Sequence, residues 1–253
     1  MSGWRVPACG PQPVAEASHW LASRLAVITG ASRGIGAATA EALAAAGARV
    51  VLAARDGRAL ESVASRIREA GGEATPVPTD VSNVQDVERL FAAVGTDGPL
   101  AALVCAAGVL TPAPLAATTS EIWGQTLGVN LTGSFLCCRE AFAAMRARGG
   151  RIVNIASLSG VYATEKFPGL TAYNVSKYGV IGLTEAIAVE GKEFGISAIC
   201  LSPGAVDTQM LRQANPELRA GLAPPDVAEM IVALLDSPMV AASGANIPLF
   251  SNA

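Results

Sequence analysis

The sequence has little of several residue types on which many catalytic and metal sites depend. It contains one histidine, His19, and only 15% of its 253 residues are charged. Its five cysteines form no CxxC pair; they are Cys9, Cys105, Cys137, Cys138 and Cys200. A zinc site and a histidine base are therefore excluded, and no metal is expected. We expect buried, reduced thiols in a cytoplasmic protein.

Clusters of basic residues and long apolar runs are also missing. The formal net charge is -3 and Lys and Arg are dispersed, so no nucleic acid partner is expected. The longest strongly apolar run covers 100–110, which is shorter than the roughly 20 residues that a membrane-spanning helix needs. Residues 1–22 carry Pro and Gly where a signal peptide has an unbroken apolar stretch. This composition predicts an irregular N-terminal extension and no membrane span.

Apolar residues are plentiful, at 51%, and their arrangement predicts one α/β domain over 23–253. Short β-rich runs alternate with longer segments of helical periodicity, as in repeated βαβ units. The predicted strands are 25–29, 48–54, 74–78, 100–106, 151–157, 196–202 and 245–250. The predicted helices are 35–46, 57–70, 83–94, 120–147, 172–194 and 225–235. Because most strands are almost continuously apolar, we expect a doubly wound parallel sheet of about seven strands with helices on both faces.

A glycine-rich turn joins the first predicted strand to the first predicted helix. Its sequence is TGASRGIG, with the spacing Gly-x-x-x-Gly-x-Gly. Glycines let the backbone approach a pyrophosphate, and the helix N-terminus supplies free N–H groups and the positive end of the helix dipole. We therefore interpret this turn as a dinucleotide-binding site, with the binding residues Gly30, Ser32, Arg33, Gly34, Ile35 and Gly36.

The residues after the second strand indicate which dinucleotide binds. A NAD-binding fold places an Asp or Glu about 20 residues after the glycines, where it accepts a hydrogen bond from the ribose 2′-hydroxyl. This chain has Ala54 and Arg55 at that place. Arg33 and Arg55 can together bind a 2′-phosphate, which favours NADP(H) over NAD(H). Two alternatives stay open: both arginines are ordinary surface residues, or Asp56 pairs with Arg55.

A candidate proton-transfer group lies at the start of the predicted helix 172–194. Tyr173 and Lys177 are four residues apart, so their side chains share one helix face. An adjacent ammonium is expected to stabilise the phenolate and so to lower the pKa of Tyr173 from its usual value of about 10. Ser157 ends a strand at the carboxyl edge of the sheet, where open α/β folds place reactive groups, and Asn130 lies in the preceding helix.

These motifs, in this order, resemble those of the short-chain dehydrogenase/reductase family. The matching segments are TGASRGIG, GVNLTGS, IVNIAS and AYNVSK, and the resemblance covers about residues 23–250. It implies a Rossmann-type fold and a catalytic tetrad of Asn130, Ser157, Tyr173 and Lys177. In the family mechanism the serine binds the substrate oxygen and the tyrosine transfers a proton to it. The lysine also binds the nicotinamide ribose, and the asparagine holds a water that links the lysine to solvent.

The resemblance also implies further cofactor contacts. These are Asp80, Val81, Ala107, Gly108, Tyr173, Lys177, Pro203, Gly204, Val206 and Thr208. Asp80 would contact the adenine, although an Asp at a strand end can instead cap the next helix. The backbone of Val206 and the hydroxyl of Thr208 would bind the carboxamide, although an ordinary Pro-Gly turn is the alternative.

The chain departs from the family pattern in three places. Residues 105–108 read CAAG instead of Asn-Asn-Ala-Gly, so backbone or water must satisfy the groups that two amide side chains normally bind. The insertion 165–169 lengthens the loop between the serine and the tyrosine, and we expect this loop to border the substrate. The segment 208–224 is short for a substrate lid, and the C-terminal end lacks the common Asp-Gly-Gly.

The substrate itself is only weakly indicated. The expected pocket residues are apolar and favour a small or medium hydrophobic carbonyl or alcohol; they are Val109, Leu158, Tyr162, Met210 and Leu211. Arg212 and Arg219 leave open a 3-oxoacyl thioester reductase. A non-catalytic NADP(H)-binding sensor and a sugar-nucleotide epimerase are less favoured, because Tyr173 and Lys177 are present and the glycine spacing differs. Family habit and high apolar content predict a homotetramer or homodimer.

Overall fold

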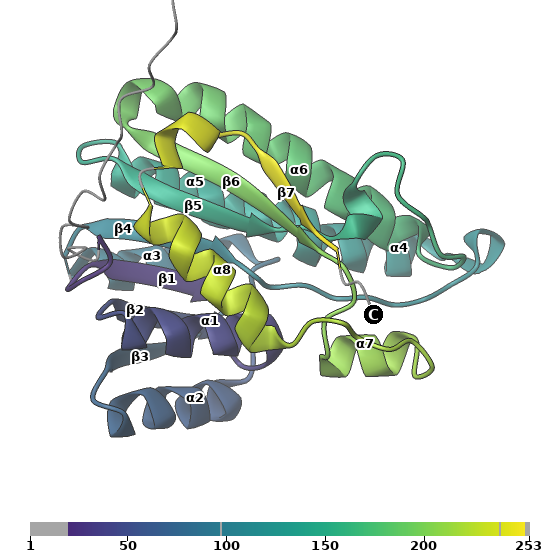
Figure 1. Ribbon diagram of the computed structural model, residues 1–253, viewed down its shortest axis with the longest axis horizontal. Helices are drawn as coiled ribbons and strands as arrows, with labels where there is room; N and C mark the ends of the chain where they lie inside the picture. The colour runs from purple at the N-terminus through teal and green to yellow at the C-terminus, as the bar shows by residue number, and fades with distance from the viewer. Residues whose placement is uncertain (1–19, 97, 238, 251–253) are drawn as a thin grey trace, which may run out of the picture.

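A single sheet of seven strands lies at the centre of the computed structural model, which describes residues 20–250 except 97 and 238 (Figure 1). The strands are β1 (Leu25–Thr29), β2 (Arg49–Ala54), β3 (Glu73–Pro78), β4 (Leu100–Cys105), β5 (Gly150–Ile155), β6 (Ile196–Pro203) and β7 (Asn246–Leu249). Their order is β3-β2-β1-β4-β5-β6-β7, and every neighbouring pair runs parallel. The predicted α/β fold with about seven parallel strands is confirmed.

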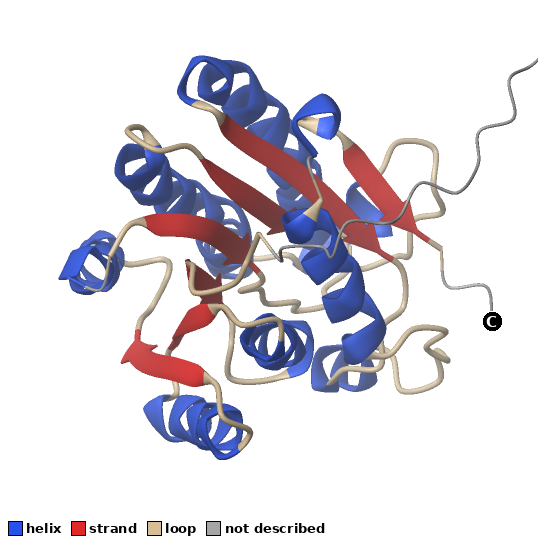
Figure 2. Ribbon diagram, turned by 60° about the vertical axis from the view of Figure 1, so that its left-hand side comes forward, coloured by secondary structure: helices blue, strands red, loops and turns tan. Residues whose placement is uncertain are grey.

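Helices cover both faces of the sheet (Figures 1 and 2). The α-helices are α1 (Gly34–Ala45), α2 (Gly57–Glu69), α3 (Val84–Thr96), α4 (Ser120–Leu127), α5 (Gly133–Met145), α6 (Thr171–Gly191), α7 (Gln209–Ala214) and α8 (Pro224–Asp236). Short helical turns are η1 (Leu115–Ala117), η2 (Gly128–Thr132), η3 (Leu158–Gly160), η4 (Lys192–Phe194) and η5 (Met239–Ala242). Buried side chains of α1, α2 and α8 belong to one apolar cluster, and those of α3, α5 and α6 belong to a second cluster on the opposite face.

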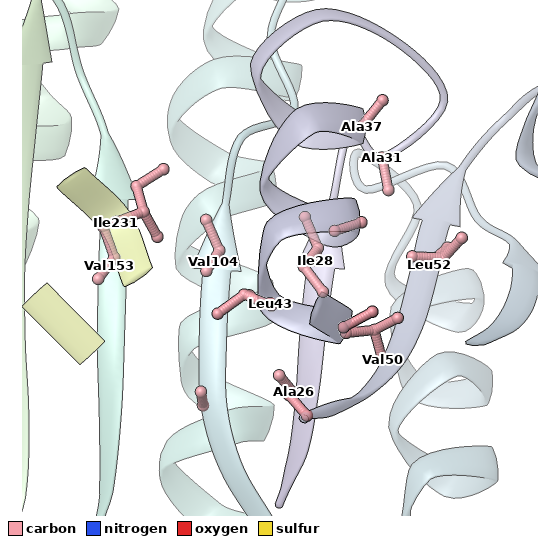
Figure 3. Packing of buried hydrophobic residues seen from close by; sticks show 14 of the residues in the cluster. Ala26, Ile28, Ala31, Ala37, Leu43, Val50, Leu52, Val104, Val153 and Ile231 are labelled. Carbon is pink, nitrogen blue, oxygen red and sulfur yellow. The ribbon is translucent and has the colours of Figure 1, made fainter. Parts of the chain in front are cut away.

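The strands are apolar on both faces because successive side chains alternate between these two clusters. In β1, Ala26 and Ile28 pack in the cluster with α1, whereas Val27 packs in the opposite one. Figure 3 shows Leu43 of α1 lying over the sheet beside Ile28 and Val104. Burial of each large aliphatic side chain contributes roughly 1.5–3 kcal/mol, so this two-sided packing fixes the strands that carry the site.

The packed structure reaches closer to the N-terminus than the predicted boundary at residue 23. Leu21 is fully buried in the cluster with α1, and the guanidinium groups of Arg24 and Arg151 lie 4.5 and 3.9 Å from the centroid of the Trp20 ring. The rest of the predicted extension, with Cys9 and His19, lies outside the described residues. Trp20 and Leu21 therefore belong to the folded domain.

Two helical segments differ from the sequence prediction. The expected single helix 120–147 is α4 and α5, joined by the π-helical turn η2, which places one extra residue in the helical path at Asn130. Apolar residues continue through the turn, so periodicity does not reveal it. The segment after β6 contains α7, which was not predicted because six residues are too few for a periodic signal; the Thr208 hydroxyl begins this helix by accepting a hydrogen bond from Leu211 N at 3.2 Å.

No helix among the described residues combines the length and the apolar character needed to cross a bilayer.

The order of the strands creates a crevice beside β1. The chain moves outward from β1 to β3 and then returns to place β4 on the other side of β1. Loops after the carboxyl ends of β1 and β4 therefore diverge, and open α/β sheets bind their ligands at such a point. The glycine turn after β1, Arg55 after β2 and Asp80 after β3 all lie at this edge of the sheet.

Candidate active site

A cleft of about 1170 Å³ opens at this edge. Its lining includes the predicted cofactor residues Gly30, Ser32, Arg33, Gly34, Ile35, Gly36, Arg55, Asp80, Val81, Ala107, Gly108 and Thr208. Pro203, Gly204 and Val206, and the candidate catalytic residues Tyr173 and Lys177, are not part of this lining. The cleft is thus built by segments that are far apart in the sequence and that the carboxyl ends of β1, β2, β3, β4 and β6 bring together.

The glycine turn leaves space for a ligand and none for side chains. Gly30 has a φ of +67°, and a β-carbon there would lie 2.7 Å from the backbone of Ala107. A β-carbon on Gly36 would lie 2.3 Å from the carbonyl oxygen of Gly30. No side chain caps the first turn of α1, which begins after Arg33, so its N–H groups stay available to an anion. This turn fits a dinucleotide pyrophosphate.

The part of the cleft beside the end of β2 carries two arginines, and β2 itself does not end in an acid. Arg33 donates a hydrogen bond from Nη1 to Gln209 Oε1 at 2.8 Å, and Arg55 lines the same cleft. Asp56 does not pair with Arg55 as one alternative held. Its carboxylate caps α2 by accepting hydrogen bonds from Arg58 N and Ala59 N at 3.0 and 3.1 Å. Both arginines therefore face the cleft, and the Asp56 carboxylate that caps α2 does not neutralise them.

Asp80 stabilises its own turn instead of capping α3. Its Oδ1 accepts hydrogen bonds from the backbone N and the hydroxyl of Ser82, at 2.9 and 2.6 Å, while Asn83 caps the helix. Partial burial acts to raise the pKa of Asp80, but the two Ser82 hydrogen bonds and the nearby charge of Arg55 outweigh it and hold the pKa below its usual value. Asp80 is thus an ionised hydrogen-bond acceptor, and the positive charge of Arg55 stabilises its carboxylate.

Tyr173 and Ser157 lie together at the two ends of the loop between β5 and α6. The Ser157 side chain lies near enough to the phenol of Tyr173 to lower its pKa. Burial raises the pKa of Tyr173, and the effect of Ser157 only partly opposes that change. The predicted lowering of this pKa by the Lys177 ammonium is therefore wrong for this structure. The phenol stays protonated at neutral pH because the low-dielectric surroundings disfavour the phenolate.

Lys177 is buried, with 5% of its surface exposed, and its ammonium lies 5.7 Å from the centre of the Tyr173 ring. It donates a hydrogen bond to Ile155 O at 2.8 Å. Burial lowers the pKa of Lys177 to about 8, while the neighbouring thiols of Cys200 and Cys105 act in the opposite direction. The amine therefore exchanges a proton near neutral pH far more readily than an exposed lysine does.

Asn130 is completely buried in η2, and its side chain holds the loop that follows β4. Its Oδ1 accepts a hydrogen bond from Val109 N at 2.8 Å, and its Nδ2 donates to Val109 O and to Ser176 Oγ, both at 3.0 Å. Both amide protons are used, so a water at this side chain can only donate to the remaining lone pair of Oδ1. Gly108 lies between this amide and Lys177: a β-carbon there would be 3.5 Å from Oδ1 and 3.8 Å from Nζ.

The comparison with known proteins agrees with this arrangement. A family model described as short chain dehydrogenase matches residues 24–219, which is most of the chain. The chain belongs to the short-chain dehydrogenase family. The resemblance carried by the four sequence motifs is confirmed.

Individual members of the short-chain dehydrogenase family match over most of their length. A 3-oxoacyl-[acyl-carrier-protein] reductase of Synechocystis sp. is 36% identical over 200 residues, which cover 78% of this chain and 80% of that protein. A short-chain type dehydrogenase/reductase from Mycobacterium marinum has a TM-score of 0.85 at 31% identity, over 91% of this chain and 95% of that one. A 3-oxoacyl (acyl-carrier-protein) reductase from Agrobacterium tumefaciens with NADP bound has a TM-score of 0.83 at 29% identity, over 92% and 95%. This chain is therefore an oxidoreductase of that family.

Some residues that organise this short-chain dehydrogenase were missed in the sequence. Thr29 Oγ1 accepts a hydrogen bond from Ala107 N at 3.2 Å, so side chains of Thr29 and Asn130, rather than backbone or water alone, bind the groups after β4. Ser176 links Asn130 to the backbone oxygen of Tyr173, at 2.7 Å. Ser176 was within the quoted motif AYNVSK, but its position next to Asn130 needs the tertiary fold.

The substrate side agrees only in part with the expected apolar pocket. Met210 and Val109 line the cleft, and Met210 Cε would lie 3.9 Å from a β-carbon on Gly108. Tyr162 is 86% exposed and does not line a pocket as expected. Its neighbour Val161 is held within the loop, where Val161 O accepts hydrogen bonds from Thr164 Oγ1 at 3.0 Å and from Tyr178 OH at 3.1 Å.

Proposed function

We propose that this chain is an NADP(H)-dependent oxidoreductase that moves a hydride between a nicotinamide ring and a carbonyl or secondary alcohol. The observation that carries the proposal is the contact of the Tyr173 phenol with Ser157, beside the buried ammonium of Lys177. Gly108 joins this group to the dinucleotide-sized cleft, since it lines the cleft and lies next to Lys177 Nζ.

The chemistry divides between the cofactor and the protein. When bound, the nicotinamide ring supplies or accepts the hydride at the reacting carbon. Ser157 donates a hydrogen bond to the substrate oxygen, and Tyr173 donates its proton to that oxygen in the reductive direction. The phenol of Tyr173 is protonated at neutral pH, so it has a proton to donate. Lys177 binds the cofactor ribose and returns a proton towards Tyr173, and Asn130 fixes the loop at Gly108.

The preference for NADP(H) rests on charge at the adenosine end. Arg33 and Arg55 both line the cleft, and β2 ends in Ala54 instead of an acid. Two guanidinium groups can bind a 2′-phosphate through charge-assisted hydrogen bonds, whereas a carboxylate at Ala54 would repel it. The Agrobacterium tumefaciens relative with NADP bound supports this assignment by similarity.

The favoured substrate is a small or medium hydrophobic carbonyl or alcohol, because Met210 and Val109 present apolar surface at the cleft. A 3-oxoacyl thioester is the second candidate. Arg212 lines the cleft and is the residue available to a phosphorylated carrier, although it is paired with Asp207. The Synechocystis relative that carries the name of such a reductase also favours this candidate.

Assembly into a homodimer or homotetramer is part of the proposal. Large apolar side chains are exposed along α4, α5 and α6; they are Trp123, Phe135, Val175, Tyr178 and Val189. Surfaces of this kind are commonly covered by a second subunit. Size-exclusion chromatography with light scattering tests this part separately from catalysis.

The activity is tested by incubating the purified full chain with NADPH or NADH and a panel of ketones, aldehydes and 3-oxoacyl thioesters. We expect loss of NADPH absorbance with at least one carbonyl class, and a higher kcat/KM with NADPH than with NADH. Tight NADPH binding without turnover of any substrate would instead support the sensor. Failure to bind either nucleotide would overturn the proposal.

A further inference from the structure

The loop between Ser157 and Tyr173 is organised around one ammonium group. Lys166 donates hydrogen bonds from Nζ to Val161 O at 2.6 Å, to Thr164 Oγ1 at 2.6 Å and to Leu158 O at 3.2 Å. An ammonium has three N–H groups, and these three oxygens account for all of them. All three acceptors belong to the same loop and none is a carboxylate. Lys166 thus crosslinks the loop internally. We call Leu158, Val161, Thr164 and Lys166 together the Lys166 cage.

Each backbone oxygen of the cage accepts hydrogen bonds from more than one donor. Leu158 O also accepts hydrogen bonds from Val161 N at 3.0 Å and from Thr164 Oγ1 at 2.6 Å. Val161 O also accepts one from Tyr178 OH at 3.1 Å. Carbonyl dipoles that point at one place repel each other, and a positive charge placed among them turns that repulsion into attraction. Without the ammonium, this turn loses the group that holds its oxygens together.

The cage is connected to Ser157 at the start of the loop and to the backbone of Lys177 in α6. Ser157 directly precedes η3 and begins it, because Ser157 Oγ accepts a hydrogen bond from Ser159 N at 3.1 Å. Gly160 rests on the backbone of Lys177, where an added β-carbon would lie 2.5 Å from the carbonyl carbon. The cage therefore holds η3 in contact with α6 at Lys177.

The far end of the loop is fixed independently of Lys166. Gly169 O accepts a hydrogen bond from Ala113 N at 2.9 Å, and Gly169 has a φ of +81° with the Ala113 backbone 3.7 Å from its β-position. Loss of the Lys166 ammonium is thus expected to loosen 158–166, next to Ser157, and to leave the end near Tyr173 in place.

We propose that Lys166 is a positioning residue of the reaction, which holds η3 on α6 and so keeps the Ser157 hydroxyl at the substrate oxygen and at Tyr173. This inference rests on the proposed function. Lys166 touches neither the dinucleotide cleft nor the reacting atoms, and its own contacts are all within the loop and with the ring of Tyr178, 5.2 Å away. Its effect is therefore on turnover and not on cofactor binding.

The test compares Lys166→Met with Lys166→Arg, and with Lys192→Met as a control at an exposed lysine of η4. Fluorescence titration with NADPH counts the folded, cofactor-competent sites, and kcat is expressed per such site. We expect Lys166→Met to lower kcat about 10-fold to 100-fold, since misplacement by about 1 Å costs this much. Lys166→Arg keeps the charge and the donors and should recover most of the turnover. Lys192→Met should match the wild type.

Two further measurements separate positioning from simple loss of stability. The upper limb of the pH profile of kcat should move to higher pH in Lys166→Met, because Ser157 moves away from Tyr173 and no longer lowers its pKa. Hydrogen exchange of the amides of Gly160 and Val161, which bind Ser157 O and Leu158 O, should become faster. A wild-type kcat per site with an unchanged pH profile in Lys166→Met would overturn the inference.

The failure of the proposed function gives a different pattern. If the wild type binds no nucleotide or turns over no carbonyl, the oxidoreductase proposal fails. If the wild type is active and Lys166→Met is equally active, only the positioning role fails. A kcat loss that Lys166→Arg does not recover would also reject the role of the ammonium.

Discussion

Lys177 and Tyr173 lie one helical turn apart on α6, with the ammonium nitrogen 5.7 Å from the centre of the phenol ring. Burial lowers the pKa of the amine to about 8 and raises the pKa of the phenol. The ammonium of Lys177 is thus a stronger acid than the phenol of Tyr173, whereas in water the two groups have nearly equal pKa values. This difference favours proton movement from the ammonium to the phenolate after Tyr173 has protonated a substrate.

The replacement Tyr173→Phe removes the phenolic oxygen and keeps the ring. We expect kcat to fall about 10²-fold to 10⁴-fold, because proton transfer by a positioned side chain contributes that much. The dissociation constant of NADPH should stay within about twofold, since the phenol is not part of the cleft lining. Initial rates and fluorescence titration measure the two quantities. The control Tyr162→Phe, at the 86% exposed ring, should keep full activity, and a near-normal Tyr173→Phe would rule out the acid/base role.

Replacement of Arg33 and Arg55 by Ala tests the cofactor preference. Each lost charge-assisted hydrogen bond to a phosphate costs about 1.5–3 kcal/mol, so the NADPH dissociation constant should rise about 10-fold to 100-fold per residue. NADH has no 2′-phosphate, and its affinity should change much less. Arg58→Ala is a matched control, because Arg58 is exposed nearby but lies outside the cleft lining. Equal losses for NADPH and NADH would contradict the assignment.

Much of the fold could be predicted from the sequence, because its strands are marked by local patterns. β1 to β7 each fall within two residues of the predicted ranges, since parallel strands buried on both faces are apolar throughout. The glycine turn was equally visible, because Gly30, Gly34 and Gly36 lie within seven residues directly after β1. These features depend on short stretches of chain.

The features that escaped prediction depend on contacts between distant segments. The hydrogen bond from Arg33 to Gln209 joins residues that are 176 positions apart, and α7 itself is too short to show periodicity. The pKa of Tyr173 was predicted in the wrong direction because spacing on a helix reveals a neighbour but not the burial of both groups. The π-helical turn places Asn130 where it binds Val109, in the loop after β4, and Ser176 of α6.

The buried ammonium of Lys177 makes the stability of the protein depend on pH. Its pKa is lowered from 10.5 to about 8 in the folded protein. Between these values the unfolded chain keeps a proton that the folded protein has released, so the free energy of unfolding should rise with pH through this window. Below pH 8 both states are protonated, and the full cost of burying the charge, about 3 kcal/mol, is present.

The variant Lys177→Met isolates this cost. At pH 7 the cofactor-free variant should be more stable than the wild type by about 1–3 kcal/mol, because a buried charge is replaced by an apolar side chain. The difference should shrink as the pH approaches 10. Burial raises the pKa of Cys200 to about 11 and the charge of Lys177 opposes that rise, so the two proteins are compared below the pH at which this thiol titrates in the folded state. Urea unfolding at pH 7 and at higher pH measures the difference in the free energy of unfolding between the two proteins. A difference that does not change with pH would contradict the lowered pKa of Lys177.

The change Gly30→Ala tests whether the glycine turn is required by space as well as by backbone conformation. Gly30 and Gly71 both have a positive φ, +67° and +87°, but a β-carbon on Gly30 would meet the Ala107 backbone at 2.7 Å, whereas none of the described atoms lies within 4 Å of one on Gly71. Gly71→Ala should cost only the left-handed conformation, about 1–2 kcal/mol. Gly30→Ala should cost roughly 1–3 kcal/mol more, from overpacking, and should abolish NADPH binding. Urea unfolding and fluorescence titration compare the two variants, and equal losses of stability with intact NADPH binding in both would show that the contact with Ala107 does not limit this turn.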